Sequence, residues 1–491
     1  MRSVAKLIIV LAFGVGLLAC TVGPDFRPPV VPAPGVWGPE RTDVPSRTIA
    51  AEVDSEWWRS FNDPELTSLI SRLAAQNLDL QSAAERVMQG RAQRQVVASQ
   101  GLPNLDEQSQ FTRTRQSPNG TVSLFTPAPG APLQYNLWQN GLSASWELDL
   151  FGRIRRGVEA QDAATLASVE NRRGIALSLL AELAQDYLQL RGVQAELAIV
   201  ERNAQVAARN TVLVRNQFSN GVATTLDMAQ ARSQQATIAA SVPPLRTLQA
   251  ALINAIGLLL AEQPRALQAE LTPRSAQPAV PLLVPVGLPG ALVRRRPDVR
   301  EAEARLHAAT AQTGVAVAGF YPDVSLSGMG DLNGLKFVNA FSLPSGAFQI
   351  GPTLSIPLFE GGRLTGQLRL RRSEQREAAI SFQKTVLQAW QEVDNALTAF
   401  AEAQQQRMQT AEATRQNQAA LQAAQQRYAE GAADFLNVIT SESQLLQSEN
   451  SLANSDTEIA TDLVALYRAL GGGWQVADTA GAVDKAHWYD R

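Results

Sequence analysis

The chain has 491 residues with 43 Lys and Arg against 46 Asp and Glu, and its formal net charge of −3 offers no attraction for nucleic acid, so we expect no nucleic-acid partner. Its single cysteine and two histidines, His307 and His487, cannot assemble a disulfide framework or a zinc cluster within one chain, which excludes enzymes built on either. Aromatic residues make up only 6% of a chain rich in Ala, Gln, Leu, Glu and Arg, and this composition predicts long helices.

The first nineteen residues have the pattern of a secretory signal peptide. Arg2 and Lys6 precede an apolar run over 7–19, which contains two glycines. A run of this length is too short to span a membrane comfortably as a helix, whereas it fits the apolar region of a signal sequence. We therefore expect this segment to be removed.

The apolar run ends at Leu17-Leu18-Ala19-Cys20, which resembles the bacterial lipobox. In that motif the cysteine thiol is acylated and the cysteine becomes the new N-terminus. We expect Cys20 to carry a covalent diacylglycerol and an N-acyl chain, since stable anchoring needs more than one acyl chain. The alternative is that Cys20 is an ordinary thiol of the apolar run. Thr21 stands where an Asp would favour the inner membrane, so the outer membrane is expected.

Comparison of the chain with itself indicates two halves of one repeat. Residues 77–103 match 296–322 at an offset of 219, and Gly221 matches Gly431 at an offset of 210. Chance similarity between helices is the alternative, but it does not explain shared glycines and prolines outside helices. The predicted divisions are a signal peptide at 1–19, an acylated Pro-rich arm at 20–55, a first repeat at 56–263, a Pro-rich linker at 264–290, a second repeat at 291–473 and a tail at 474–491.

Each repeat has strand patterns ahead of its long helix. In 142–150 and in 350–358, apolar and polar residues alternate over nine positions, which suits a tilted transmembrane strand. A soluble, half-buried hairpin is the alternative. Fainter patterns at 105–114 and 324–330 complete hairpins at about 103–151 and 322–359, with turn-rich loops at 117–132 and 331–345.

Four strands cannot close a cylinder wide enough for solutes, and an open sheet edge facing lipid leaves backbone groups without hydrogen bonds. Several copies must therefore share one barrel. Two copies give a barrel of eight strands, and side chains fill the interior of a barrel of that size. Three copies give twelve strands, the smallest such assembly with room for water. A homotrimer follows as a hypothesis.

A long helix follows each hairpin. The stretch 153–217 contains no proline and would extend on the order of 100 Å as one helix. Apolar residues recur along it at alternating spacings of three and four, the pattern of a narrow packing seam. It ends at a glycine turn, 219–221, and its counterpart ends at 429–431. We expect helical hairpins over about 153–257 and 363–470.

These features together resemble the TolC superfamily of outer-membrane efflux proteins, most closely its acylated NodT-like and OprM-like branch. The resemblance covers residues 20–474. The motifs that carry it are the two glycine turns and Cys20-Thr21-Val22-Gly23-Pro24-Asp25-Phe26-Arg27-Pro28-Pro29, Trp57-Trp58-Arg59-Ser60-Phe61-Asn62-Asp63-Pro64-Glu65-Leu66 and Arg295-Arg296-Pro297-Asp298-Val299-Arg300.

The resemblance implies a mixed α/β membrane protein. Its fold would be a homotrimeric, 12-stranded transmembrane β-barrel with four strands per chain, continuing into a long periplasmic α-helical barrel. Such a protein is the lipid-anchored outer-membrane channel of a tripartite efflux system. It passively conducts small amphiphilic or toxic compounds delivered by a periplasmic adaptor, or membrane fusion protein, and an inner-membrane pump of the RND type. No catalytic or cofactor-binding motif is present, so we expect no enzyme activity and no metal.

The resemblance also implies roles for the helix tips. The adaptor would dock at Asn220, Gly221, Val222, Glu430, Gly431 and Ala432, although both glycines also suit plain helix caps. Candidates for a periplasmic gate are Asp227, Arg427, Tyr428, Asp434 and Glu442. Many relatives carry Asp near Thr440. Glu442 is two positions further on, about 200° around a helix, which argues against its replacing that Asp in an acidic constriction.

Two other function classes compete with the efflux channel. One is a lipid-anchored periplasmic coiled-coil scaffold or adaptor without a pore, which leaves the paired strands unexplained. The other is the outer-membrane channel of a protein secretion system. Among single residues, Trp57 and Trp58 favour core packing over an interfacial anchor, and His307 lies on a helical pattern with no evident partner, which indicates a structural role.

Overall fold

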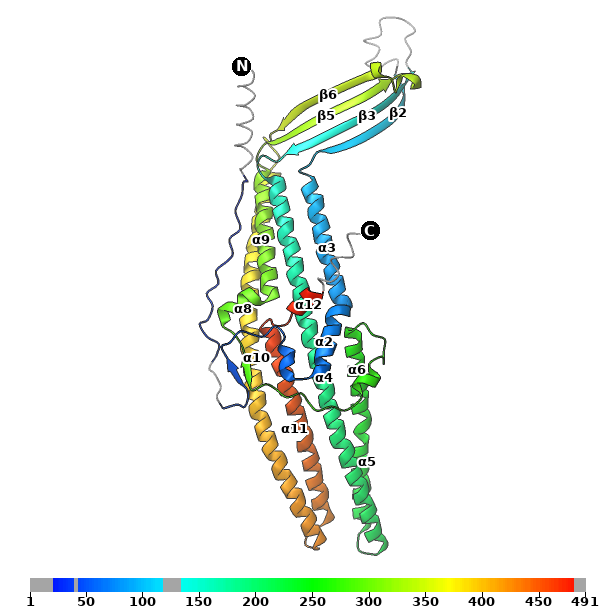
Figure 1. Cartoon of the computed structure of the whole chain (residues 1–491), viewed down its shortest axis with the longest axis vertical. Coiled ribbons are helices and arrows are strands. Elements are labelled where there is room, and N and C mark those ends of the chain that lie inside the picture. Colours follow the sequence, from blue (N-terminus) through cyan, green and yellow to red (C-terminus); the bar gives the residue numbers. More distant parts are fainter. Residues whose placement is uncertain (1–20, 39–42, 118–133, 481–491) are drawn as a thin grey trace. The chain divides into compact units, whose positions relative to one another are not determined.

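The computed structural model describes residues 21–38, 43–117 and 134–480 (Figure 1). The chain forms two compact units, each made of segments that are far apart in the sequence. The first unit comprises Met1–Pro29, Val87–Ala167 and Glu303–Ser381, and the second comprises Val30–Arg86, Ser168–Ala302 and Phe382–Arg491. The expected signal peptide and Cys20 lie outside the described residues, as does most of the expected loop 117–132.

The first unit contains an antiparallel sheet of four strands in the order β2-β3-β5-β6. The strands are β2 (Asn104–Arg115), β3 (Gln134–Leu148), β5 (Asp323–Gly334) and β6 (Gly346–Ser355). Each is long enough for a tilted membrane crossing. Because the order follows the chain, β2 and β6 are the two edges of the sheet.

The strand boundaries differ from the sequence-based expectation, and β6 begins at Gly346, ahead of the expected 350. β3 begins at Gln134, well before the expected 142, because its first half pairs with β2 although polar residues such as Asn136 and Asn140 interrupt its apolar face. β5 continues to Gly334, into the expected loop. β6 ends at Ser355, shortly before Pro357, which has no N–H to donate to a ladder.

Four helices have residues in both units: α3 (Leu78–Ser99), α4 (Arg153–Ser219), α9 (Pro297–Ala318) and α10 (Arg363–Ala429). α4 and α10 are each 67 residues long and contain no proline. The expectation of one continuous helix over 153–217 is therefore confirmed.

The second unit holds the two helical hairpins, α4 with α5 (Thr225–Ala240) and α10 with α11 (Phe435–Ala469). The return helix of the first hairpin is not continuous. It breaks at Ser241, and α6 (Val242–Leu259) follows with prolines in its first turn, where the missing N–H groups cost nothing. The remaining elements of the unit are β1 (Arg47–Ile49), η1 (Trp57–Phe61), α2 (Pro64–Gln76), α7 (Gln268–Leu271), β4 (Leu283–Pro285), α8 (Pro289–Arg295) and α12 (Gln475–Ala480).

The main apolar core also lies in the second unit. Trp57, in η1, is 1% exposed and stacks on Tyr467 of α11 at a centroid distance of 5.2 Å. Its indole N–H donates to the Gly472 carbonyl at 3.0 Å, and Trp58 packs edge-on against it. The expectation that both tryptophans serve core packing is confirmed.

Candidate functional site

One face of the four-stranded sheet is apolar. Directly paired residues of antiparallel strands point to the same side, so Ala144 shares a face with Leu105 of β2, and Gly328 with Ile350 of β6. The large side chains of this face are Leu105, Phe111, Trp138, Leu142, Trp146, Leu326, Phe348, Ile350 and Leu354. Phe348 is 86% exposed and Ile350 71%. An exposed apolar surface of this kind marks an interaction with lipid or protein.

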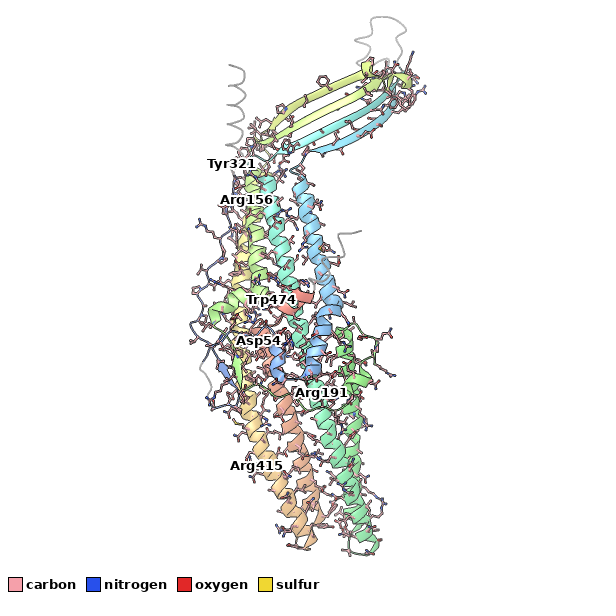
Figure 2. The ribbon with its side chains drawn as sticks, viewed as in Figure 1. Asp54, Arg156, Arg191, Tyr321, Arg415 and Trp474 are labelled. Atoms are coloured by element: carbon pink, nitrogen blue, oxygen red, sulfur yellow. The ribbon has the colours of Figure 1, made fainter. Side chains whose placement is uncertain are left out.

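Aromatic contacts of the first unit lie at the two ends of the strands, whereas the isolated Phe348 lies midway along the sheet. Phe111 and Trp138 pack at a centroid distance of 4.3 Å, and Phe337, beyond the end of β5, meets Trp138 edge-on at 4.9 Å. At the opposite end of the strands Tyr321, labelled in Figure 2, stacks on Phe151 at 4.8 Å. Two aromatic groups separated by aliphatic side chains are the pattern of a transmembrane barrel wall.

The opposite face of the sheet is mainly polar, and the larger apolar side chains on it are Tyr135, Leu137 and Met329. It carries Asn104, Asp106, Gln108, Gln110, Ser143, Ser145, Ser327, Asp331, Gln349 and Thr353. A hollow of about 370 Å³ lies over this face and is lined mainly by these residues. The polar face is therefore the concave one, as expected for a wall whose inner side meets water.

The charged residues of the apolar face lie on one edge strand. Among the described strand residues they are Glu107, Arg113 and Arg115, all in β2. Charge on an edge strand prevents unspecific pairing, whereas charge on a lipid-facing strand is costly.

One helical stretch in the described part of the chain, Thr225–Leu259, is long and apolar enough to cross a membrane by length and composition. It consists of α5 and α6, which are interrupted at Ser241, and its Arg246 pairs with Glu201 of α4. A single such helix is weak evidence. The sheet is the stronger membrane candidate because both its faces and both its ends fit.

The two hairpin tips have the same backbone geometry. Gly221 and Gly431 have φ of +76° and +71°, left-handed values that glycine adopts without strain. The N–H of Val222 donates to Gln217 O at 2.9 Å, and the N–H of Ala432 donates to Arg427 O at 2.8 Å. Both tips are therefore glycine-capped helix ends of the Schellman type.

The predicted docking residues all lie at these caps and are exposed. They are Asn220, Gly221 and Val222 at the first tip and Glu430, Gly431 and Ala432 at the second. A Cβ added at either glycine would meet nothing within 4 Å among the described residues, and Val222 is 75% exposed. The surface around each glycine is thus open to a partner.

Beside the tips, Tyr428 links the two hairpins. Its hydroxyl donates to Gln217 Oε1 at 2.8 Å, and its ring packs on Phe435 at a centroid distance of 5.4 Å. Burial raises the pKa of Tyr428, the hydrogen bond to Gln217 opposes that shift, and the charge of nearby Asp227 adds to it. Asp227 itself forms a capping box with Thr224 at the start of α5. The structure therefore brings Tyr428 and Asp227 into one neighbourhood.

The other gate candidates are placed differently. Arg427 and Asp434 are exposed, and Asp434 precedes α11 without a side-chain cap hydrogen bond. Glu442 is buried and accepts a hydrogen bond from Asn210 Nδ2 at 2.6 Å, and burial raises its pKa. Its carboxylate is turned toward α4, whereas Thr440 on the same helix is exposed.

Sequence reasoning did not single out Asn210, Gln217 and Phe435, which make the main contacts of the tip region. Phe435 had a local signal, since it is the first apolar residue after the glycine turn. Asn210 and Gln217 had none, because each lies among similar polar residues of α4 and its partner is more than 200 residues away.

Comparisons with known proteins agree with this geometry. The family model described as "Outer membrane efflux protein" matches residues 69–261 and 288–472. The solvent efflux pump outer membrane protein SrpC of Pseudomonas putida is 30% identical over 480 residues, covering 93% of this chain and 96% of the relative. The cation efflux system protein CusC of Escherichia coli is 28% identical over 460 residues, covering 94% and 97%. The structure of the outer-membrane channel OprN superposes with a TM-score of 0.83 at 33% identity, covering 93% of this chain and all of that one.

Proposed function

The chain belongs to the outer membrane efflux protein family, and from this membership we propose a homotrimeric, lipid-anchored duct that opens at its helix tips. The protein is the outer-membrane channel of a tripartite efflux system, extends into the periplasm, and is not an enzyme. A periplasmic scaffold without a pore is not favoured, because the relatives are channels.

The observation that carries the proposed trimer is the division of the sheet into an apolar face and a polar face with two edges. A single chain would expose the backbone groups of β2 and β6 to lipid, at several kcal/mol for each group left unsatisfied. Pairing β2 of one copy with β6 of the next removes both edges. Three copies give twelve strands, enough for a water-filled interior lined by the concave polar face.

The proposed gate is the set of tip contacts around Tyr428. A periplasmic adaptor that binds the exposed surface at Gly221 and Gly431 would compete with or strain the Tyr428–Gln217 hydrogen bond. That single bond is worth about 0.5–1.5 kcal/mol, so a docked partner can break it readily. The inner-membrane pump, of the RND type, supplies the energy, and the channel conducts passively.

The proposed cargo is small amphiphilic or toxic compounds. One relative is named for the efflux of solvents and another for the efflux of cations, although each aligns with this chain over almost its whole length. A wide polar lumen of this kind selects little, so the pump determines what is exported. Acylation of Cys20 belongs to this proposal and follows from the lipobox-like sequence.

A matched pair of variants tests the membrane assignment. Ile350→Lys places a charge on the apolar face of β6, where it costs about 2–4 kcal/mol near the bilayer midplane. Gln349→Lys places the same charge on the adjacent polar face. We expect Ile350→Lys to abolish detergent-stable trimers and conductance in planar bilayers. Gln349→Lys should still insert and shift the ion selectivity toward anions. Equal insertion of both variants would contradict the assignment of the two faces.

A further inference from the structure

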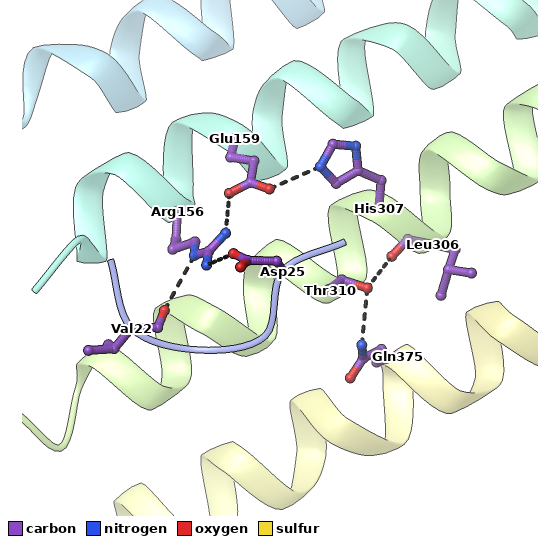
Figure 3. A network of polar contacts seen from close by, with 8 residues as sticks. All are labelled: Val22, Asp25, Arg156, Glu159, Leu306, His307, Thr310 and Gln375. Atoms are coloured by element: carbon purple, nitrogen blue, oxygen red, sulfur yellow. Dashed lines mark hydrogen bonds and ion pairs between the residues drawn. The ribbon is translucent and has the colours of Figure 1, made fainter. Parts of the chain in front are cut away.

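The segment that begins the described chain is bound by a buried arginine. Arg156 lies in the first turns of α4, and its side chain is only 6% exposed (Figure 3). Its guanidinium donates to Asp25 Oδ1 at 2.6 Å, to Glu159 Oε2 at 2.7 Å and to the Val22 carbonyl at 3.3 Å. Each of its three nitrogens has an acceptor, and two of the three acceptors belong to the N-terminal segment.

A second side chain of the same site comes from α9. His307 Nε2 lies 3.0 Å from Glu159 Oε1, and the imidazole stacks on the Phe26 ring at a centroid distance of 4.3 Å and an angle of 14°. Glu159 therefore joins Arg156 and His307. The expectation that His307 has no partner is wrong, because both partners come from distant parts of the sequence.

The backbone of the segment also fits its surroundings closely. Gly23 has φ of +97°, and a Cβ there would lie 2.5 Å from the Cα of Gly314 in α9. A Cβ at Gly152 would lie 2.8 Å from the Thr21 side chain. The N–H of Val22 donates to Phe151 O at 3.2 Å, at the junction of β3 and α4.

Residues 21–27 would form the chain terminus once the expected signal peptide is removed, and a terminus is poorly ordered unless contacts such as these hold it in place. Here shape, aromatic stacking and a buried guanidinium all act on seven residues. A buried guanidinium needs acceptors, and Glu159 alone satisfies only one of its three nitrogens. The site is therefore complete only when residues 21–27 occupy it.

We propose that Arg156, Glu159 and His307 form a docking site for the chain's own segment Thr21–Arg27. Arg156 is the positioning residue of this site. The site fixes the start of the mature chain beside the junction of β3 and α4, where an acyl group on the preceding residue could enter the membrane next to the sheet. The acyl group and the start of the mature chain rest on the proposed function; the docking itself does not.

Limited proteolysis of the full-length protein in detergent tests the docking. Chymotrypsin can cut after Phe26, whose ring is stacked on His307 in the docked segment. We expect Arg156→Met and Asp25→Asn each to speed this cut at least tenfold, read by mass spectrometry of the N-terminal fragment. Arg153→Met is the matched control, because Arg153 lies in the same turn of α4 and pairs with Glu147 of β3, and it should leave the rate unchanged.

Two features keep the test decisive. The Asp25 side chain is 81% exposed, so Asp25→Asn should fold even if Arg156→Met does not. The double variant, with Arg156→Met and Asp25→Asn, should be cut no faster than Arg156→Met alone, because both substitutions break the same contact between Arg156 and Asp25. Wild-type cleavage rates in both single variants, or additive rates in the double variant, would overturn the docking site. If the wild-type protein conducts no ions in planar bilayers, that result would instead overturn the proposed channel.

Discussion

The core around Trp57 and the hairpin tips, both in the second unit, are built in opposite ways. The core is a large cluster in which Trp57, Phe61, Tyr187 and Tyr467 are almost completely buried. At the tips, a small cluster is formed by Val214, Met228, Ala231, Phe435 and Val438, while Val222 and Leu226 nearby are largely exposed. A densely packed core resists displacement, whereas few contacts make a region that opens at low free-energy cost.

Polar contacts follow the same division. In the core, the Tyr187 hydroxyl donates to Asp63 Oδ2 at 2.7 Å, and Asn77 donates to the Leu259 carbonyl at 2.8 Å. The first bond ties the start of α2 to α4, and the second ties the junction of α2 and α3 to the end of α6. At the tips, single side-chain pairs join one hairpin to the other. The comparison shows that a smaller buried cluster and fewer polar contacts hold the two hairpins together at the tips than at the core, as the proposed gate requires.

The largest effect is expected from Trp57→Ala. Removing this buried ring loses its packing on Tyr467 and its hydrogen bond to Gly472, at about 3–5 kcal/mol in the free energy of unfolding. Denaturant unfolding followed by circular dichroism measures it. Phe218→Ala, at the half-exposed ring of the first tip, is the control and should cost less than about 1 kcal/mol. Similar losses in both variants would remove the contrast between core and tips.

Asn210→Ala should have the next largest effect, confined to the tips. It leaves the buried Glu442 carboxylate without its hydrogen bond, at about 1–3 kcal/mol. Burial raises the folded-state pKa of Glu442 above its ordinary 4.5. The folded protein therefore holds this proton more tightly than the unfolded chain does. The free energy of unfolding falls as the pH rises from the ordinary pKa through the raised pKa. The variant should therefore have lower hydrogen-exchange protection factors at the tips at pH 7 than at pH 4, once each rate is divided by the intrinsic exchange rate at its own pH. Equal protection factors at both values would contradict the role of the carboxylate, and Asn210→Ala with Glu442→Gln should restore protection.

Tyr428→Phe should loosen the tip by about 1 kcal/mol, because it removes only the hydroxyl that bonds Gln217. The ring and its packing on Phe435 stay. Open probability in planar bilayers should rise about fivefold without a change in melting temperature. Tyr187→Phe is the matched change in the core, and it should lower the melting temperature without opening the channel. A closed Tyr428→Phe channel would show that this bond is no part of the gate.

The smallest effect is expected from Asp186→Asn in the α4 part of the core. Burial, together with the charge of Glu182, raises the pKa of Asp186 from 3.8 to about 6. The folded state thus binds a proton more tightly than the unfolded state, and stability falls as the pH rises from about 4 to about 6. Asp186→Asn should stabilise the protein by less than about 1 kcal/mol at pH 7, since solvent screens a half-exposed carboxylate, and should have no effect at pH 3. Stabilisation of the same size at both pH values would contradict the raised pKa.

Much of the helical fold could be predicted from local pattern. The absence of proline and the three-four spacing of apolar residues over 153–217 predicted α4. Gly221 predicted the end of α4, and Gly431 predicted the end of α10. The break at Ser241 was missed although Pro243 and Pro244 follow it, because the apolar pattern continues through the break. The same glycine turns placed the predicted docking residues next to the caps, and their role in docking, which the family resemblance implies, stays a prediction.

Some features depend only on neighbouring residues and follow from the sequence alone. They are the long helices, their glycine caps and the alternation of apolar and polar side chains along the strands. These follow from backbone hydrogen bonds and side-chain periods that span a few positions. Tertiary structure alone decided that β3 begins at Gln134, that His307 meets Phe26, and that Glu442 faces Asn210. Such contacts depend on the rotation of one helix or the register of one strand against another. A change of one residue turns a helix by about 100°, and no local pattern fixes that angle across hundreds of residues.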